Sequence, residues 1–90
     1  MSEDRPDEYY VGRLLGRVKL VIATDDDIPV ETKLEAQPML KELAITLSAP
    51  PDQQDQERAI GQHQYLLDTL DDYPNCTALL TALRNFVPYL

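Results

Sequence analysis

Residues 9–24 read YYVGRLLGRVKLVIAT and hold most of the long apolar side chains in the first third of the chain. At about 100° per residue, the larger apolar side chains fall within an arc of about 140°, as in a helix that lies on a core. Gly12, Gly16 and Ala23 lie on the opposite side. Because glycine costs about 1 kcal/mol relative to alanine inside a helix, this face predicts close approach by another helix. The stretch therefore predicts a central helix, in which leucine at Gly16 would destabilise the fold.

A second helix is predicted from Val30 to Ser48. Residues 25–29, DDDIP, end the first helix and open a turn, since the residue before a proline avoids the α region and proline favours helix starts. Pro38 lies inside the second helix, where proline removes a backbone hydrogen bond. The pattern allows one helix kinked at Pro38 or two short helices broken there.

Two further helices are predicted in the second half of the chain. Asp52 and Asp55 are placed to accept from the free amides at the start of the third helix, which should end near Asp72. The connection at residues 73–75, YPN, supplies an asparagine cap for the fourth helix, and Pro88 is expected to end it. With short connections and no alternating strand pattern, these elements predict an all-α fold, a three- to four-helix antiparallel bundle.

Length and terminal composition set the expected organisation. The charged segment at residues 1–7 is expected to be a flexible tail, and residues 8–90 are expected to form one helical domain. There is no signal peptide pattern and no apolar run long enough for a membrane span. The single cysteine, Cys76, excludes a disulfide within the chain and agrees with a reducing compartment. We therefore expect a cytoplasmic protein with no membrane contact.

The charge balance favours a partner with a basic surface. Sixteen acidic and eight basic residues give a net charge of -8, which repels nucleic acid backbones and favours basic proteins. In an antiparallel bundle, six aspartates should meet at one end of the molecule. These six are Asp25, Asp26, Asp27, Asp68, Asp71 and Asp72. Asp52, Asp55 and Glu57 should lie at the other end, and we expect no direct binding of nucleic acid.

Four tyrosines are further candidates for partner binding, because tyrosine combines a large apolar ring with a polar tip that suits interfaces. They are Tyr9, Tyr65, Tyr73 and Tyr89. The same side chains would also suit contact between two copies of the chain, so a homodimer stays open.

Catalytic, cofactor and metal sites are not expected. His63 is the only histidine and, on an apolar stripe, is typical of a structural hydrogen-bonded residue. Cys76 is expected to be an inert buried thiol, although a helix N-terminus can lower a thiol pKa. The aspartates lack the spacing and glycine of a calcium loop. The chain holds no glycine-rich phosphate loop and no nucleophile near a base, so an enzyme is not expected.

Residues 9–15, YYVGRLL, resemble the Tyr-x-x-Gly-Arg-Leu-Phe stretch of a known family. That stretch belongs to the C-terminal helical part of the large subunit of type I-C CRISPR surveillance complexes, a part also made separately as a small subunit. The resemblance implies a helix in such a complex, or an inhibitor that imitates this helix. It departs from the pattern at Leu15, where the family has phenylalanine. Small subunits of that kind contact nucleic acid, which the acid excess of this chain opposes.

Two functions follow as expectations. The first is a non-enzymatic interaction module, a small acidic helical adaptor or subunit that docks on a basic partner surface. The second is an acidic inhibitor of phage type, anti-CRISPR-like or a nucleic-acid mimic, which would block a nucleic-acid-binding complex. Charge placement distinguishes them, because a mimic needs carboxylates in a row along one face.

Overall fold

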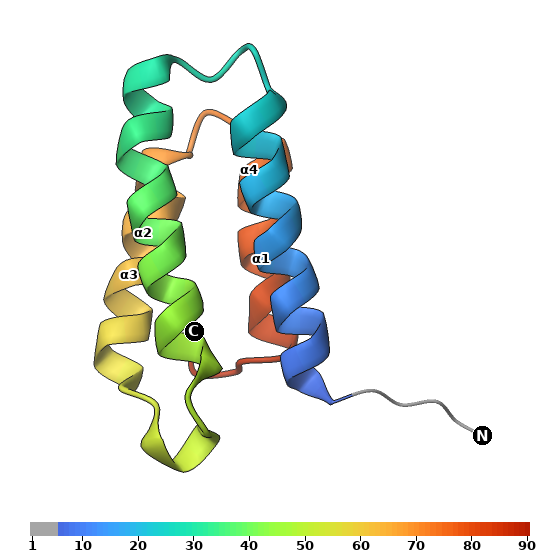
Figure 1. Cartoon of the computed structure of the whole chain (residues 1–90), viewed down its shortest axis with the longest axis vertical. Coiled ribbons are helices and arrows are strands. Elements are labelled where there is room, and N and C mark those ends of the chain that lie inside the picture. The colour runs from blue at the N-terminus through green and yellow to red at the C-terminus, as the bar shows by residue number, and fades with distance from the viewer. Residues whose placement is uncertain (1–5) are drawn as a thin grey trace, which may run out of the picture.

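The computed structural model describes residues 6–90 and consists of helices joined by short turns (Figure 1). The helices are α1 (Asp7–Thr24), α2 (Val30–Ser48), α3 (Gln56–Thr69) and α4 (Pro74–Ala82), with short 3-10 helices η1 (Pro51–Gln53) and η2 (Leu83–Asn85). No strand occurs within residues 6–90. The predicted all-α antiparallel bundle is confirmed.

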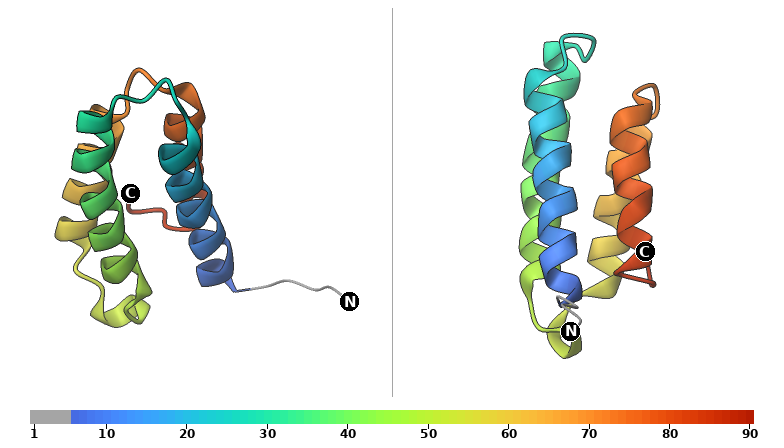
Figure 2. Two further views of the ribbon diagram at one scale, coloured as in Figure 1. Left: turned by 45° about the horizontal axis from the view of Figure 1, so that its top comes forward. Right: turned by 90° about the vertical axis from the view of Figure 1, so that its right-hand side faces the viewer.

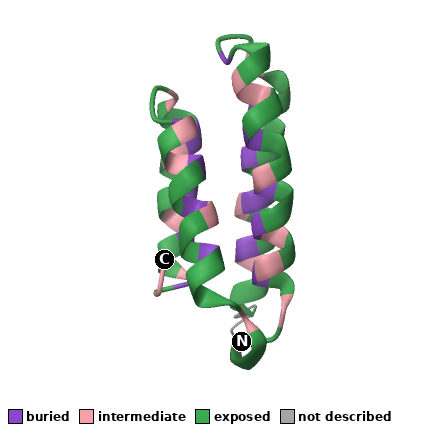
Figure 3. Ribbon diagram, turned by 90° about the vertical axis from the view of Figure 1, so that its left-hand side faces the viewer, coloured by how far each residue is buried: buried purple, intermediate pink, exposed green. Residues whose placement is uncertain are grey.

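The four helices form two layers (Figure 2). The α1 and α2 helices make one layer and α3 and α4 the other, with α1 packed mainly on α2 and α4, and α3 on α2 and α4. Buried residues lie on the faces of the two layers that are turned toward each other (Figure 3). Ile22, Leu43, Leu66 and Leu80 are fully buried there. This core holds the ends of the helices, and therefore the loops, in fixed relative positions.

The predicted apolar face of α1 is confirmed, whereas its predicted second face is wrong. Val11, Leu15, Val18 and Ile22 are buried. The glycine face is exposed instead, and a Cβ atom built on Gly12 or Gly16 meets no heavy atom within 4 Å. The α1 helix is therefore not central: it has two helical neighbours, as each of the other helices has. Small residues on a helix face permit another helix to approach closely, but they do not require one to be there.

Pro38 lies inside one continuous α2 helix, so the alternative of two short helices is wrong. The predicted bounds of α2 are confirmed. Proline has no amide hydrogen, so the carbonyl of Leu34 lacks its donor in the helix. Leu34 and Val30 lie off the buried face, with 65% and 70% of their surfaces exposed.

The start of α3 differs in part from the prediction. The Asp55 side chain accepts a hydrogen bond from the amide of Arg58 at 3.1 Å and caps the helix. Asp52 lies in η1 instead, because the two prolines before it begin a 3-10 turn rather than the α-helix. The α3 helix also ends at Thr69, earlier than predicted, where the Tyr73 amide bonds to the Leu70 carbonyl at 2.9 Å.

The α4 helix is shorter than predicted. Pro74 occupies its first turn and no side chain caps it, so the predicted asparagine cap at Asn75 is wrong. The helix changes to η2 after Ala82, before it reaches Pro88, which therefore does not end it. Of the predicted tail at residues 1–7, residues 1–5 lie outside the described part, and Asp7 already belongs to α1.

Candidate interaction surfaces

The six aspartates predicted to meet do lie at one end of the molecule. Residues 25–27 belong to the turn between α1 and α2, Asp68 to the last turn of α3, and Asp71 and Asp72 to the turn between α3 and α4. Both turns are at the top of Figure 1. We call these six residues the aspartate pole. Asp25 is half-buried and the other five are exposed.

Hydrogen bonds orient two of the six carboxylates of the aspartate pole but do not neutralise them. Asp25 Oδ1 accepts from the Asp27 amide at 2.8 Å, and Asp68 Oδ1 accepts from Gln64 Nε2 at 2.9 Å. The one ion pair between described residues, Arg58 to Asp55 at 3.7 Å, lies elsewhere. Within the described structure, the pole therefore presents uncompensated negative charge.

The four candidate tyrosines do not share a surface. Tyr65 is exposed on α3, whereas Tyr73 and Tyr89 pack partly against the core. The Tyr89 hydroxyl donates to Gln54 Oε1 at 2.6 Å, and burial raises the pKa of this tyrosine. Tyr9 is half-buried, with its ring edge-on to Tyr10 at 5.2 Å. Three of the four therefore pack against other side chains, and Tyr65 is the exposed one, with 40% of its surface accessible.

His63 and Cys76 are both buried. His63 Nε2 lies 2.7 Å from the Leu80 carbonyl oxygen, so this nitrogen carries the proton in the neutral ring. Burial, and to a lesser degree the carboxylate of Asp25, raises the pKa of the Cys76 thiol. A thiol with a raised pKa is a poor nucleophile at neutral pH. The predicted hydrogen bond of His63 and the burial of Cys76 are confirmed.

The burial of His63 predicts that the fold loses stability in mild acid. Loss of hydration lowers the pKa of His63 below 6.5, with Arg84 adding to the shift and the Leu80 carbonyl opposing it. The unfolded chain then binds a proton as pH falls through 6.5, while the folded chain does not, so the free energy of unfolding falls until the folded pKa is reached. Chemical denaturation at pH values from about 7.5 to about 5 measures this fall.

His63→Gln is the control for that prediction, because glutamine keeps a donor for Leu80 and does not titrate. The difference in free energy of unfolding between the natural chain and His63→Gln should shrink as pH is lowered. A difference that stays constant over this range would contradict the prediction.

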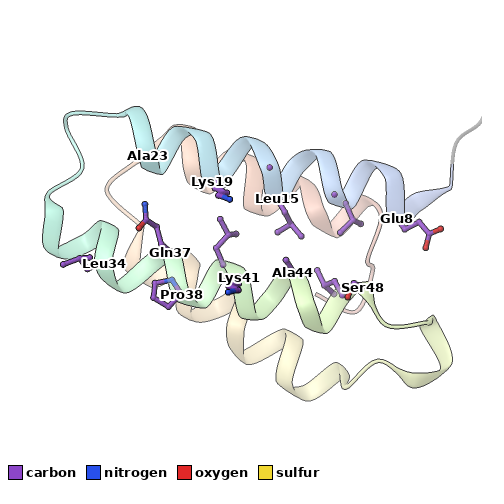
Figure 4. Close-up of a pocket in the computed structure, with 15 residues that line it drawn as sticks. Glu8, Leu15, Lys19, Ala23, Leu34, Gln37, Pro38, Lys41, Ala44 and Ser48 are labelled. Carbon is purple, nitrogen blue, oxygen red and sulfur yellow. The ribbon is translucent and has the colours of Figure 1, made fainter.

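A groove of about 980 Å³ runs between α1 and α2 (Figure 4). Its floor consists of four core residues that each remain 4–7% exposed: Val11, Leu15, Leu40 and Leu47. Small or apolar residues form much of its walls, namely Gly12, Gly16, Ala23, Leu34, Pro38 and Ala44. Lys19 on α1 and Lys41 on α2 stand on opposite walls, and Glu8 lies at one end.

No local pattern in the sequence predicts this groove. The available signals were the glycine face of α1 and the apolar residues of α2 that lie off its buried face. The glycine face predicts a neighbouring helix within the chain, whereas the change of apolar face in the second helix predicts a kink or break at Pro38. The width of the space between α1 and α2 depends on how both rest on α3 and α4, which no local pattern encodes.

Among residues 6–90, no group of three or more His, Cys, Asp or Glu side chains is arranged to hold a metal ion. None of the described helices combines the length and the apolar character needed to cross a lipid bilayer.

We compared the chain with models of protein families, with curated protein sequences and with solved structures, and found no match. The resemblance of residues 9–15 to CRISPR subunits therefore stays a prediction.

Proposed function

We propose that this chain is a non-enzymatic interaction module that docks on a basic surface of a protein partner. The observation that carries the proposal is the aspartate pole, with six carboxylates on adjacent turns and no ion-pair partner among residues 6–90. Clustered charge of one sign steers a partner of opposite sign and speeds association.

The arrangement of the other reactive groups favours binding over catalysis. The Nε2 atom of the buried His63 is hydrogen-bonded to the Leu80 carbonyl, and the Cys76 thiol is buried with a raised pKa. Neither group is presented to a substrate in solution. Most of the exposed ionisable side chains of the described surface are carboxylates, which suit recognition of a basic macromolecule.

Neutralising the aspartate pole should slow association with the partner. Replacing all six aspartates by asparagine keeps their oxygen acceptors, including that of Asp25 toward the Asp27 amide, but removes their charge. Because single exposed charges contribute only about 0.2 to 1 kcal/mol, all six are changed together. We expect the association rate at low salt to fall by about tenfold or more. The association rate is measured by stopped-flow or surface-based kinetics with the partner that affinity capture, described below, identifies.

A matched control removes the same number of charges from elsewhere on the exposed surface. The control carries asparagine or glutamine at Asp7, Glu35, Glu42, Asp52, Asp55 and Glu57. Asparagine at Asp55 keeps the cap of α3. Both variants have the same net charge, so a slower rate in the first alone places the effect at the aspartate pole. Equal rates in the two variants would refute the docking role of the pole.

Affinity capture from the organism of origin at two salt concentrations supplies the partner and tests the second candidate. The pole that favours an adaptor would also allow an acidic inhibitor to occupy a groove made for nucleic acid. Recovery of a nucleic-acid-binding protein that is released by salt would favour the inhibitor. Recovery of a different basic protein would favour the adaptor.

A further inference from the structure

We propose that the groove between α1 and α2 binds an amphipathic α-helix of a partner protein, with acidic side chains beside the apolar stripe of that helix. This inference rests on the proposed function only in treating the chain as an interaction module. The surface is a different one, because the groove runs along the helices and the aspartate pole lies at their end.

The dimensions of the groove fit a helix. One wall extends along α1 from Glu8 to Ala23 and the other along α2 from Leu34 to Ser48. At 1.5 Å per residue, walls of this kind are about 22 Å long, the length of a helix of about 15 residues. Helices recognised in such grooves insert side chains spaced at i, i+3, i+4 and i+7. The groove also opens on the side of the α1–α2 layer away from α3 and α4 (Figure 4).

The glycine face of α1 allows the backbone of a docked helix to come close. Space is open around the Cβ positions of Gly12 and Gly16. The floor between the two walls is made of leucine and valine side chains that are buried in the core but still reach solvent. An apolar groove with a polar rim is typical of a surface that another protein covers.

The charges on the walls select the class of helix. Lys19 and Lys41 lie on opposite walls of the groove, and neither has an ion pair or side-chain hydrogen bond with another described residue. Covering these two ammonium groups without a counter-charge would remove their hydration at a cost. Carboxylates beside the apolar stripe of the partner helix would supply the counter-charge. At the end that meets Glu8, a neutral or basic residue is expected.

The net negative charge of the whole chain does not prevent binding of an acidic helix in the groove. Charge interactions in solution are screened over about 8 Å at physiological ionic strength, so the distant aspartate pole acts weakly on a ligand in contact with Lys19 and Lys41. A second copy of the chain fits less well. In a two-fold dimer through this groove, the same surface faces itself, so four lysines would share one interface with only the two Glu8 carboxylates of the groove linings to offset them.

The test uses a display library of helical peptides about 15 residues long. Leucine is fixed on one stripe, and the flanking positions vary among glutamate, lysine and glutamine. The library is selected for binding to the full chain and against binding to Gly16→Leu, which fills the groove. Because nothing lies near the Gly16 Cβ, this variant should melt at or above the temperature of the natural chain. We expect the selected peptides to carry glutamate beside the stripe.

Gly61→Leu is the matched control. Gly61 is exposed on α3, with equally open space around its Cβ position, and it does not line the groove. Gly61→Leu should gain the same helix propensity as Gly16→Leu and should still bind the peptides. The double variant Lys19→Glu and Lys41→Glu tests the charge directly. It should reverse the preference, binding the glutamate peptide about fivefold less tightly and the lysine peptide about fivefold more tightly.

Several outcomes would overturn the proposal. The proposal fails if no peptide distinguishes the natural chain from Gly16→Leu, or if the selected peptides show no excess of glutamate. It also fails if the double variant keeps the peptide preference of the natural chain. A dimer in sedimentation that Gly16→Leu dissolves would assign the groove to a second copy instead. The variant with six asparagines at the aspartate pole should still bind the selected peptide, which separates failure of this proposal from failure of the proposed docking by the pole.

Discussion

Leu43→Ala is expected to lower the free energy of unfolding by about 2 to 5 kcal/mol, because it leaves a cavity in the centre of the core. Leu43 lies on α2 and is fully buried. A chain of this size has a total stability of roughly 5 to 10 kcal/mol, so this single change removes a large share of it. Thermal and denaturant unfolding monitored by circular dichroism measures the loss.

Leu34→Ala is the matched control on the same helix. Leu34 is 65% exposed on the wall of the groove, so its truncation should change the free energy of unfolding by about 0.5 kcal/mol or less. If the two variants lost similar amounts of free energy of unfolding, the face of α2 that carries Leu43 would not be the one that packs on the core.

Pro38→Ala is expected to raise the free energy of unfolding by as much as about 3 kcal/mol. Proline in a helix interior is less favourable than alanine by about this amount, because it removes a hydrogen bond and its ring crowds the preceding turn. Pro38 lies in the middle of α2, and its side chain is exposed in the groove, so alanine leaves no cavity in the core. Denaturant unfolding gives the change directly.

Pro29→Ala is the control for the loss of a proline. Pro29 lies at the N-cap of α2, where its missing amide hydrogen breaks no helical hydrogen bond. Its replacement should change stability by only about 0.5 kcal/mol. If Pro38→Ala gives no gain while the helix content is unchanged, the helix already accommodates the proline at little cost. A gain accompanied by weaker peptide binding would show that the proline shapes the groove.

Local chemistry made much of this fold predictable. The positions of Pro29, Pro50 and Pro74 place the turns, because proline restricts its own backbone and that of the preceding residue. The apolar arc of residues 9–24 identified the buried face of α1. The end at which the aspartate pole lies followed from the antiparallel order alone, since alternate connections of such a bundle lie at the same end.

Predictions failed where two local structures are equally compatible with the sequence, or where contacts with another helix determine the outcome. Asp52 and Asp55 are both good helix caps, and the 3-10 turn that follows Pro50 decides in favour of Asp55. The end of α4 depends on η2, whose tighter winding begins without a proline. The face of Gly12 and Gly16 looks the same in sequence whether a helix or solvent lies against it. Only the positions of α1 and α2 on the opposite layer decide between them.

Three of the four helix–helix interfaces join helices that follow one another along the chain. The fourth joins α1 to α4, and the stacking of Tyr10 on Phe86, which follows η2, extends it with ring centroids 5.0 Å apart. Contacts between sequence neighbours close short loops and form quickly, whereas this one must bring the two ends of the chain together. We therefore expect helical hairpins to form first during folding and the α1–α4 interface to close last. The tyrosine–phenylalanine stack would then be a late event, with little influence on the folding rate and most of its effect on the rate of unfolding.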